Sequence, residues 1–199
     1  MADVIMADSI IVALVGYLAG SIPFGLVSAR LAGLGDIRKI GSGNIGATNV
    51  LRSGNKLAAF TTLIGDAGKG AFAVALAFYF GFDDWAALAG LAAVIGHCYP
   101  IWLGFKGGKG VATAIATIAM LSWPAGLMMA GTWLVMSLVF RISSLSALTG
   151  FVTATALAFM MSADWPYIAA IAALSFWRHR DNIARLLKGT ESRISFSKK

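Results

Sequence analysis

Three short segments carry the side chains whose types and spacing could do chemistry: residues 41–52, 96–110 and 178–191. Each joins glycine or amide residues to Lys or Arg. Glycines let a ligand approach the backbone closely, and the cations attract anions such as phosphate. With Cys98 as the single cysteine and only two histidines, the chain offers neither an internal disulfide nor a Cys/His zinc set. An anionic small molecule is therefore favoured over a metal ion.

The first segment contains a formal G-x-G-x-x-G pattern at Gly41, Gly43 and Gly46, with Asp66 lying 20 residues beyond it. A dinucleotide-binding loop needs a strand before it and a βαβ unit around it. Here an apolar helix is expected to precede the loop. We therefore reject the dinucleotide interpretation.

Two other interpretations of the first segment stay open. It could be a glycine-rich turn in which Thr48 or Asn49 caps the next helix. It could also bring bare backbone close to a phosphate, because Arg38 and Arg52 lie on either side of it.

The second segment places three glycines, Gly107, Gly108 and Gly110, at the expected start of a helix, with Lys106 and Lys109 among them. Backbone N–H groups and the positive end of the helix dipole would then point at an anion, which predicts a phosphate cradle. The segment is not a Walker A loop, since glycine rather than Ser or Thr follows Lys109. A flexible hinge carrying two interfacial lysines is the alternative.

The third segment predicts a short amphipathic helix on the membrane surface, with His179 and Asn182 on one face. A basic tail attracted to anionic lipid explains the arginines but does not require the His–Asn pair. Gly189 should end the helix, and Glu191 is expected to form a salt bridge. The charge ladder and apolar stripe of the helix comprise Arg178, Asp181, Arg185, Ile183, Leu186 and Leu187.

Several polar residues fall inside apolar stretches. Asp66 and Lys69 are three residues apart, and ionisable residues at membrane depth usually pair and mark a functional cavity, although a purely structural pair is possible. Ser144, next to Ser143, could serve a site or only satisfy backbone groups. His97 is expected to be a hydrogen-bonded structural histidine.

The elements that must position these segments are membrane helices. The 199 residues are 58% hydrophobic and 13% charged, with a mean hydropathy of +0.79, which is too apolar for a soluble domain of this size. Residues 9–29, 85–105 and 142–163 contain no charge and are each long enough to cross a bilayer. We expect one membrane domain, 1–199, and a retained first span.

The charge-free stretch 110–140 decides the topology. As one helix, it would put the basic tail on the opposite face from the basic loop 36–56, whereas Lys and Arg tend to stay cytoplasmic. A break near Pro124 removes the conflict, because proline does not continue a helix interior. The predicted fold is all-α integral membrane with seven transmembrane helices, N-terminus outside and C-terminus cytoplasmic, spanning 9–33, 57–81, 85–104, 109–121, 125–140, 144–162 and 166–178.

This topology places all 16 Lys and Arg in, or opening toward, the cytoplasmic segments, and Asp3, Asp8, Asp83, Asp84 and Asp164 on the other face. The fourth and seventh helices would be only about 20 Å long at 1.5 Å per residue. Their cytoplasmic ends should therefore begin below the membrane surface and form a recessed polar pocket.

No Ser-His-Asp set, paired carboxylates or metal cluster is evident, and neither histidine begins the H-x-x-x-x-D motif of the commoner glycerolipid acyltransferases. The chain does contain a set of longer motifs: Gly20-Ser-Ile-Pro-Phe-Gly25, Gly41-Ser-Gly-Asn-Ile-Gly-Ala-Thr-Asn-Val-Leu-Arg52, Gly96-His-Cys-Tyr-Pro100, Phe105-Lys-Gly-Gly-Lys-Gly-Val-Ala-Thr113 and His179-Arg-Asp-Asn182 through Gly189 and Glu191. On these motifs the sequence resembles, over nearly its whole length, the bacterial acyl-phosphate:glycerol-3-phosphate acyltransferases, the PlsY family.

The resemblance implies roles for individual residues. The catalytic candidates are Ser42, Arg52, Lys109, His179 and Asn182. Glu191 matches a structural glutamate, and the 107–110 loop with Lys109 matches the glycerol 3-phosphate site. The full set of expected substrate-binding residues is Asn44, Thr48, Asn49, Lys69, Lys106, Gly107, Gly108, Gly110 and Ser144.

The implied reaction moves an acyl group from acyl phosphate to glycerol 3-phosphate and gives 1-acyl-glycerol 3-phosphate and phosphate. We expect these substrates and membrane lipid as partners, no cofactor, metal or nucleic acid, no obligate protein partner, and a bacterial inner-membrane location with the site facing the cytoplasm. The alternative is a small transporter or channel for an organic phosphate, although no inverted repeat is evident. A non-enzymatic scaffold would not need the dense glycine and amide motifs.

Overall fold

The structure is a computed structural model that describes residues 2–194, with side chains from residue 5 onward. Every regular element in this range is a helix. The Asp3 side chain, Lys198 and Lys199, which entered the charge-sidedness prediction, lie outside the described residues.

Ten α-helices and three short 3-10 helices make up the described chain. The α-helices are α1 (Ala2–Gly20), α2 (Phe24–Leu31), α3 (Ala47–Leu51), α4 (Lys56–Tyr79), α5 (Ala86–Cys98), α6 (Val111–Leu121), α7 (Trp123–Phe140), α8 (Ser143–Met161), α9 (Trp165–Arg178) and α10 (Arg180–Leu187). The 3-10 helices are η1 (Ile37–Lys39), η2 (Asp83–Trp85) and η3 (Ile101–Leu103).

Prolines mark two of the breaks between helices. The expected break near Pro124 is confirmed: α6 ends at Leu121, Ser122 is extended with φ −150° and ψ 93°, and Pro124 lies in the first turn of α7. The continuous helix expected over 9–33 is wrong, because the chain leaves helical geometry at 21–23, where Pro23 precedes α2.

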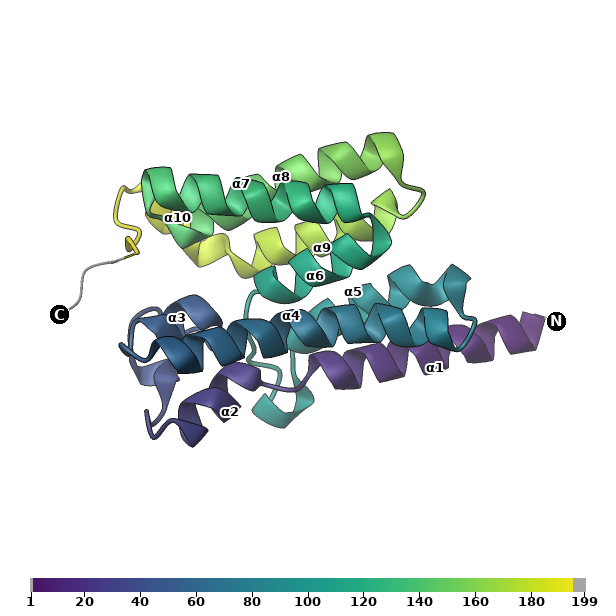
Figure 1. Cartoon of the computed structure of the whole chain (residues 1–199), viewed down its shortest axis with the longest axis horizontal. Coiled ribbons are helices and arrows are strands. Elements are labelled where there is room, and N and C mark those ends of the chain that lie inside the picture. Colours follow the sequence, from purple (N-terminus) through teal and green to yellow (C-terminus); the bar gives the residue numbers. More distant parts are fainter. Residues whose placement is uncertain (1, 195–199) are drawn as a thin grey trace.

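The helices form two groups with α6 between them, and Figure 1 shows α7, α8 and α9 on one side of α6 and α1, α2, α4 and α5 on the other. The helix α7 packs mainly on α8, α1 packs on α5, and α6 packs on α4. Small residues permit these close contacts: a Cβ at Gly16 or Gly20 of α1 would overlap the α5 backbone, and one at Gly70 of α4 would overlap α6.

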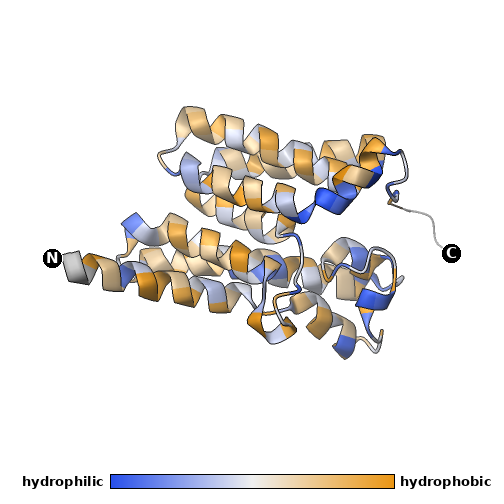
Figure 2. Cartoon of the chain, turned by 180° about the vertical axis from the view of Figure 1, so that it is seen from behind, coloured by the Kyte–Doolittle hydropathy of each residue, from blue (hydrophilic) through white to orange (hydrophobic). Residues whose placement is uncertain are grey.

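Four segments of the described chain are long and apolar enough to cross a membrane: Ile5–Leu31, Asp83–Leu103, Trp123–Phe140 and Ser143–Met161. The helix α6 is a shorter apolar helix. Orange apolar residues cover most of the helix lengths in Figure 2, whereas blue polar residues gather near the end that carries α10 and the C-terminal segment. This pattern supports a multi-pass membrane protein.

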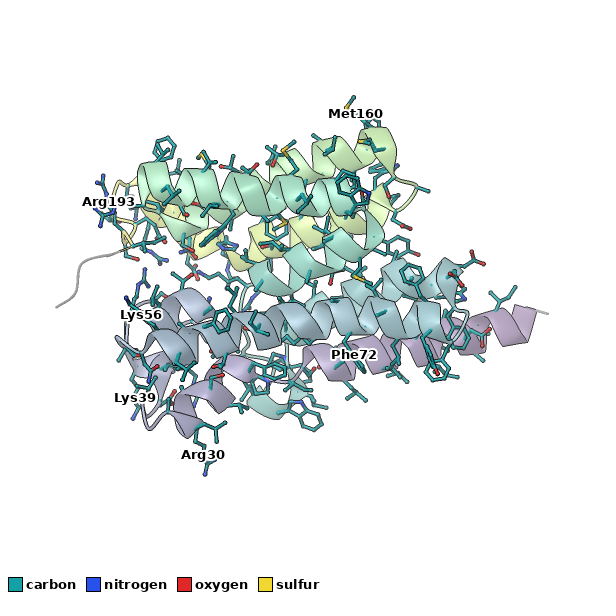
Figure 3. The ribbon with its side chains drawn as sticks, in the orientation of Figure 1. Arg30, Lys39, Lys56, Phe72, Met160 and Arg193 are labelled. Carbon is teal, nitrogen blue, oxygen red and sulfur yellow. The ribbon has the colours of Figure 1, made fainter. Side chains whose placement is uncertain are left out.

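The basic residues gather at one end of the described molecule. Arg30, Lys39, Lys56 and Arg193 are all labelled at that end in Figure 3, while Phe72 and Met160 lie along the apolar body. The same end contains α3 and α10, so the predicted chemical segments lie where the basic residues are concentrated.

Candidate active site

A cavity of about 530 Å³ opens among α3, α4, α6, α8 and the α9–α10 junction. The polar residues lining it include members of all three segments singled out in the sequence, together with residues of α4, α8 and the C-terminal segment. They are Ser42, Asn44, Thr48, Asn49, Arg52, Lys56, Asp66, His97, Lys109, Ser143, Ser144, His179, Asn182, Glu191 and Ser192.

The cavity brings together most of the predicted site residues but not all of them. All five catalytic candidates line it, as do Asn44, Thr48, Asn49, Gly110, Ser144 and Glu191. Four substrate-binding candidates do not line it: Lys69, Lys106, Gly107 and Gly108. The exposed Lys106 side chain and the buried Lys69 therefore lack the predicted place in the pocket, while the roles of the other residues stay predictions.

Asn49 holds the first segment in place through side-chain hydrogen bonds. Its Oδ1 accepts hydrogen bonds from the Ser42 backbone N–H at 2.9 Å and from Ser42 Oγ at 3.3 Å, and its Nδ2 donates to the Ile37 carbonyl at 2.9 Å. Gly41 has φ +54°, and a Cβ there would overlap Asn49 Oδ1. The amide is thus used in holding the loop that presents Ser42.

The helix-capping expectation for the first segment is wrong. Thr48 and Asn49 lie inside α3 rather than ahead of α4, and Asn55 caps α4 by accepting a hydrogen bond from the Ala58 N–H at 2.9 Å. The short helix α3 precedes the long helix α4. Thr48 Oγ1 instead lies 3.4 Å from Ser143 Oγ, at the start of α8.

Arg52 follows α3 and reaches the C-terminal segment. Its Nη2 donates a hydrogen bond to Ser192 Oγ at 2.8 Å, and both residues line the cavity. A guanidinium in this place presents several further N–H donors, which suits a phosphate group. No pattern in the sequence indicates a role for Ser192, because only the folded chain brings position 192 to position 52.

A series of hydrogen bonds connects Lys109 through Asn182 of α10 to Glu191, which follows this helix. Lys109 Nζ donates to Asn182 Oδ1, and Asn182 Nδ2 donates to Glu191 Oε1 at 2.5 Å. Glu191 also accepts from Ser144 Oγ at 2.9 Å and forms the expected salt bridge with Arg185, with 2.7 Å between Nε and Oε2. Glu191 thus orients Asn182, which in turn holds the lysine ammonium at the cavity.

The second segment differs from the predicted phosphate cradle, because two of its backbone N–H groups are already hydrogen-bonded within the protein. The Gly107 N–H donates to the Cys98 carbonyl at 3.1 Å and the Gly108 N–H to the His97 carbonyl at 3.0 Å. These two amides are therefore not available to a phosphate. The N–H groups of the first turn of α6, which starts after Gly110 and lines the cavity, have no partner within the helix and retain that capacity.

Arg178 also holds the 107–110 loop, by donating hydrogen bonds to two of its carbonyls. Its Nε donates to the Gly108 carbonyl at 3.0 Å and its Nη2 to the Gly107 carbonyl at 2.9 Å, and its guanidinium lies over the Tyr99 ring. Ser175 Oγ donates to the Lys109 carbonyl at 3.1 Å. The sequence predicted only a charge ladder for Arg178, since helical spacing carries no information about a partner 70 residues away.

His179 is buried and its ring orientation is defined by α9. Its Nδ1 lies 2.8 Å from the Ser175 carbonyl, and because a carbonyl only accepts, Nδ1 carries the proton and Nε2 remains an acceptor. Burial, assisted by the Lys109 charge, lowers the pKa of His179 from its ordinary value to about 4. The imidazole is therefore neutral at neutral pH.

Lys109 lies outside the apolar helices, and its surroundings in the site change its pKa. Burial lowers the pKa of Lys109 to about 8, although nearby Glu191 acts in the opposite direction. The ammonium is thus mostly protonated at neutral pH but loses its charge at moderately alkaline pH.

Comparisons with known proteins match nearly the whole chain. A family model described as glycerol-3-phosphate acyltransferase matches residues 10–189. The glycerol-3-phosphate acyltransferase of Jannaschia sp. (strain CCS1) is 55% identical over 184 residues, covering 92% of this chain and 91% of the relative. That of Paramagnetospirillum magneticum is 53% identical over 196 residues and covers 98% of both chains.

Two solved structures share the fold. PlsY (YgiH), an integral membrane glycerol 3-phosphate acyltransferase, superposes in its glycerol 3-phosphate form with a TM-score of 0.87 and 40% identity, covering 94% of this chain and 96% of that one. Its lysophosphatidic acid form gives a TM-score of 0.85 and 39% identity, covering 93% and 94%. Since the family model and these relatives extend over nearly the whole sequence, the chain belongs to the glycerol-3-phosphate acyltransferase family.

Proposed function

We propose that this chain transfers a fatty acyl group from acyl phosphate to the sn-1 hydroxyl of glycerol 3-phosphate, giving 1-acyl-glycerol 3-phosphate and phosphate. The observation that carries the proposal is that Arg52 and Lys109 line one cavity together with His179 and Asn182. The related PlsY structures are a glycerol 3-phosphate form and a lysophosphatidic acid form, which correspond to the acceptor and the product.

The donor's chemistry explains why no covalent intermediate is needed. An acyl phosphate is a mixed anhydride: the acceptor oxygen attacks the acyl carbonyl carbon, the bond from that carbon to the phosphate oxygen breaks, and phosphate leaves. The enzyme must hold two anions together and align the hydroxyl with the carbonyl. Arg52, Lys109 and the first turn of α6 supply positive charge and N–H donors for the phosphates and for the charge that develops on the carbonyl oxygen.

The rest of the cavity wall is apolar and suits the acyl chain. The helices α4, α6 and α7 contribute apolar side chains to the wall. These side chains are Ala59, Phe60, Leu63, Ile115 and Trp133. The two kinds of wall fit a substrate with an anionic head and an apolar tail.

We further propose the predicted membrane arrangement: one domain, seven spans, the N-terminus outside, the C-terminus cytoplasmic, and a bacterial inner-membrane location. Here α1 and α2 act as one interrupted span, followed by α4, α5, α6, α7, α8 and α9. Residues of α3 and α10, which lie at the basic end, line the cavity. Lys and Arg concentrate on the cytoplasmic side of membrane proteins, which supports this orientation. Both anionic substrates would then arrive from the cytoplasm.

A direct assay tests the function. The purified chain in lipid nanodiscs is given acyl phosphate and radiolabelled glycerol 3-phosphate, and the lipid product and free phosphate are measured. We expect equal amounts of labelled lysophosphatidate and phosphate. Phosphate release without lysophosphatidate, or uptake of label into liposomes without acylation, would contradict the proposal.

Loss of the Lys109 charge should make kcat/KM fall on the alkaline side of its pH profile. Because the lysine is charged only below its pKa of about 8, kcat/KM should fall as pH rises through that value. In Lys109→Arg the cation persists to higher pH, since a guanidinium does not lose its proton in this range. The measurement is a pH profile of kcat/KM from pH 6 to 10 for both proteins, and an unmoved limb in the variant would assign it to another group.

His179→Gln should lower kcat by about 10²-fold, the low end of what a positioned proton acceptor contributes. Glutamine keeps a polar side chain but does not take a proton. With its pKa at about 4, His179 is already unprotonated at pH 7, so no acid limb near pH 6 should belong to it. Nearly full turnover of the variant in the purified assay would exclude a histidine base and leave a substrate phosphate oxygen as the proton acceptor.

A further inference from the structure

Three ionisable side chains form a buried cluster at the cavity wall, and two of them, Asp66 and His97, line the cavity. Asp66 and Lys69 of α4 and His97 of α5 are 2%, 5% and 4% exposed. Asp66 Oδ1 lies 2.8 Å from Lys69 Nζ and 3.4 Å from His97 Nδ1, and Lys69 Nζ also donates to the Ile22 carbonyl at 2.8 Å. Charges at this depth are costly, so their retention indicates a function beyond filling space.

The cluster is connected to the second segment through His97. The His97 carbonyl accepts the Gly108 N–H, and the imidazole Nε2 occupies the space that a Cβ at position 108 would need. The backbone of Gly108 does not have a positive φ, so the requirement for glycine there is steric and comes from the imidazole. His97 is thus the surface on which this loop rests.

The contact with His97 determines where Lys109 is placed. Arg178 donates to the Gly107 and Gly108 carbonyls, and the His97 carbonyl accepts the Gly108 N–H, so both backbone polar groups of the residue before Lys109 are hydrogen-bonded. Asp66 in turn faces the His97 ring, and Lys69 balances the charge of Asp66.

We propose that Asp66 and His97 are positioning residues for glycerol 3-phosphate binding: they set the height of the 107–110 loop and thereby the place of Lys109 and the first turn of α6. This inference rests on the proposed function. A solely structural ion cluster would predict a different kinetic result, because misfolded protein lowers kcat by reducing the active fraction and leaves both KM values unchanged.

The first experiment separates these possibilities by steady-state kinetics in nanodiscs. In His97→Ala and Asp66→Asn we expect KM for glycerol 3-phosphate to rise about tenfold or more, with KM for acyl phosphate changed less than about threefold, as follows from loss of binding in one subsite. His97→Asn keeps a polar group near the position of Nδ1 but lacks the ring atoms that lie against Gly108, so its KM for glycerol 3-phosphate should stay raised. A fall in kcat with both KM values unchanged would overturn the inference.

The second experiment uses the contact between His97 and Gly108. Gly108→Ala should lower kcat/KM by about 10²-fold, because a displacement of about 1 Å in a catalytic site has an effect of this size. Removing the ring in the double variant with His97→Ala should return part of this loss. Losses that multiply in the double variant would show that the two positions act independently and would overturn the inference.

A matched control is Gly68→Ala. Gly68 lies in α4 near Asp66, but a Cβ there meets no atom within 4 Å, so its kinetics should stay within about twofold of wild type, as expected for a tolerated substitution. If the wild-type protein itself forms no lysophosphatidate, the proposed function fails. If it does and the KM pattern is absent, only the positioning inference fails.

Discussion

Replacing Lys109 with methionine should lower kcat/KM for acyl transfer by about 10³-fold, the upper range for removing one preorganised electrostatic group. Methionine preserves the length and apolar stem of the side chain but removes the ammonium that Asn182 holds at the cavity. The site then lacks a cation next to the first turn of α6. Initial rates of lysophosphatidate formation over a range of both substrates measure the effect.

Lys106→Met is the matched control for this prediction. Lys106 belongs to the same glycine-rich segment, three residues earlier, but it is exposed and does not line the cavity. Its replacement should change kcat/KM by less than about threefold, because an exposed charge outside a site contributes little. Equal losses in Lys106→Met and Lys109→Met would mean that the segment acts through general positive charge and not through the arrangement described above.

Arg52→Met should produce the second largest loss, about 10²- to 10³-fold in kcat/KM. Arg52 is the only predicted catalytic cation contributed by the first segment, and it lines the cavity. Arg52→Lys should restore only part of the activity, because an ammonium does not reproduce the two-pronged geometry that a guanidinium offers to phosphate.

The control for Arg52 is Lys39→Met, at an exposed position on the same basic end and outside the cavity. We expect wild-type kinetics within about twofold, as for most surface substitutions. Melting temperatures measured in parallel separate a lost site from a lost fold. Undiminished turnover of Arg52→Met would remove Arg52 from the catalytic set.

Ser192 orients the guanidinium of Arg52 through a hydrogen bond. In this structure the Ser192 hydroxyl accepts from the guanidinium at the mouth of the cavity, and Ile194, two residues on, is buried and donates its N–H to the Arg141 carbonyl at 2.6 Å. The C-terminal segment is therefore part of the wall of the site. A phosphate entering the cavity meets an Arg52 that is already oriented.

The sequence alone determined the membrane class, the main helices and the residues worth testing. Apolar length, the position of Pro124 and the basic segments are local properties, and each has a direct physical consequence that needs no knowledge of packing. The pairing of Asp66 with Lys69 and of Glu191 with Arg185 also follows from short spacing and is present in the structure. The predicted span over 9–33 is interrupted in the structure, because the chain leaves helical geometry at 21–23, where Pro23 precedes α2.

The tertiary structure alone decided which of these residues meet. It excludes Lys106 from the cavity and turns the N–H groups of Gly107 and Gly108 toward α5. It also brings Arg178 to the 107–110 loop and Ser192 to Arg52. These contacts join positions up to 140 residues apart and depend on how α4, α6 and α9 pack. A linear pattern fixes the face of a helix but not the neighbour on which that face lies, so the geometry of the site arises only on folding.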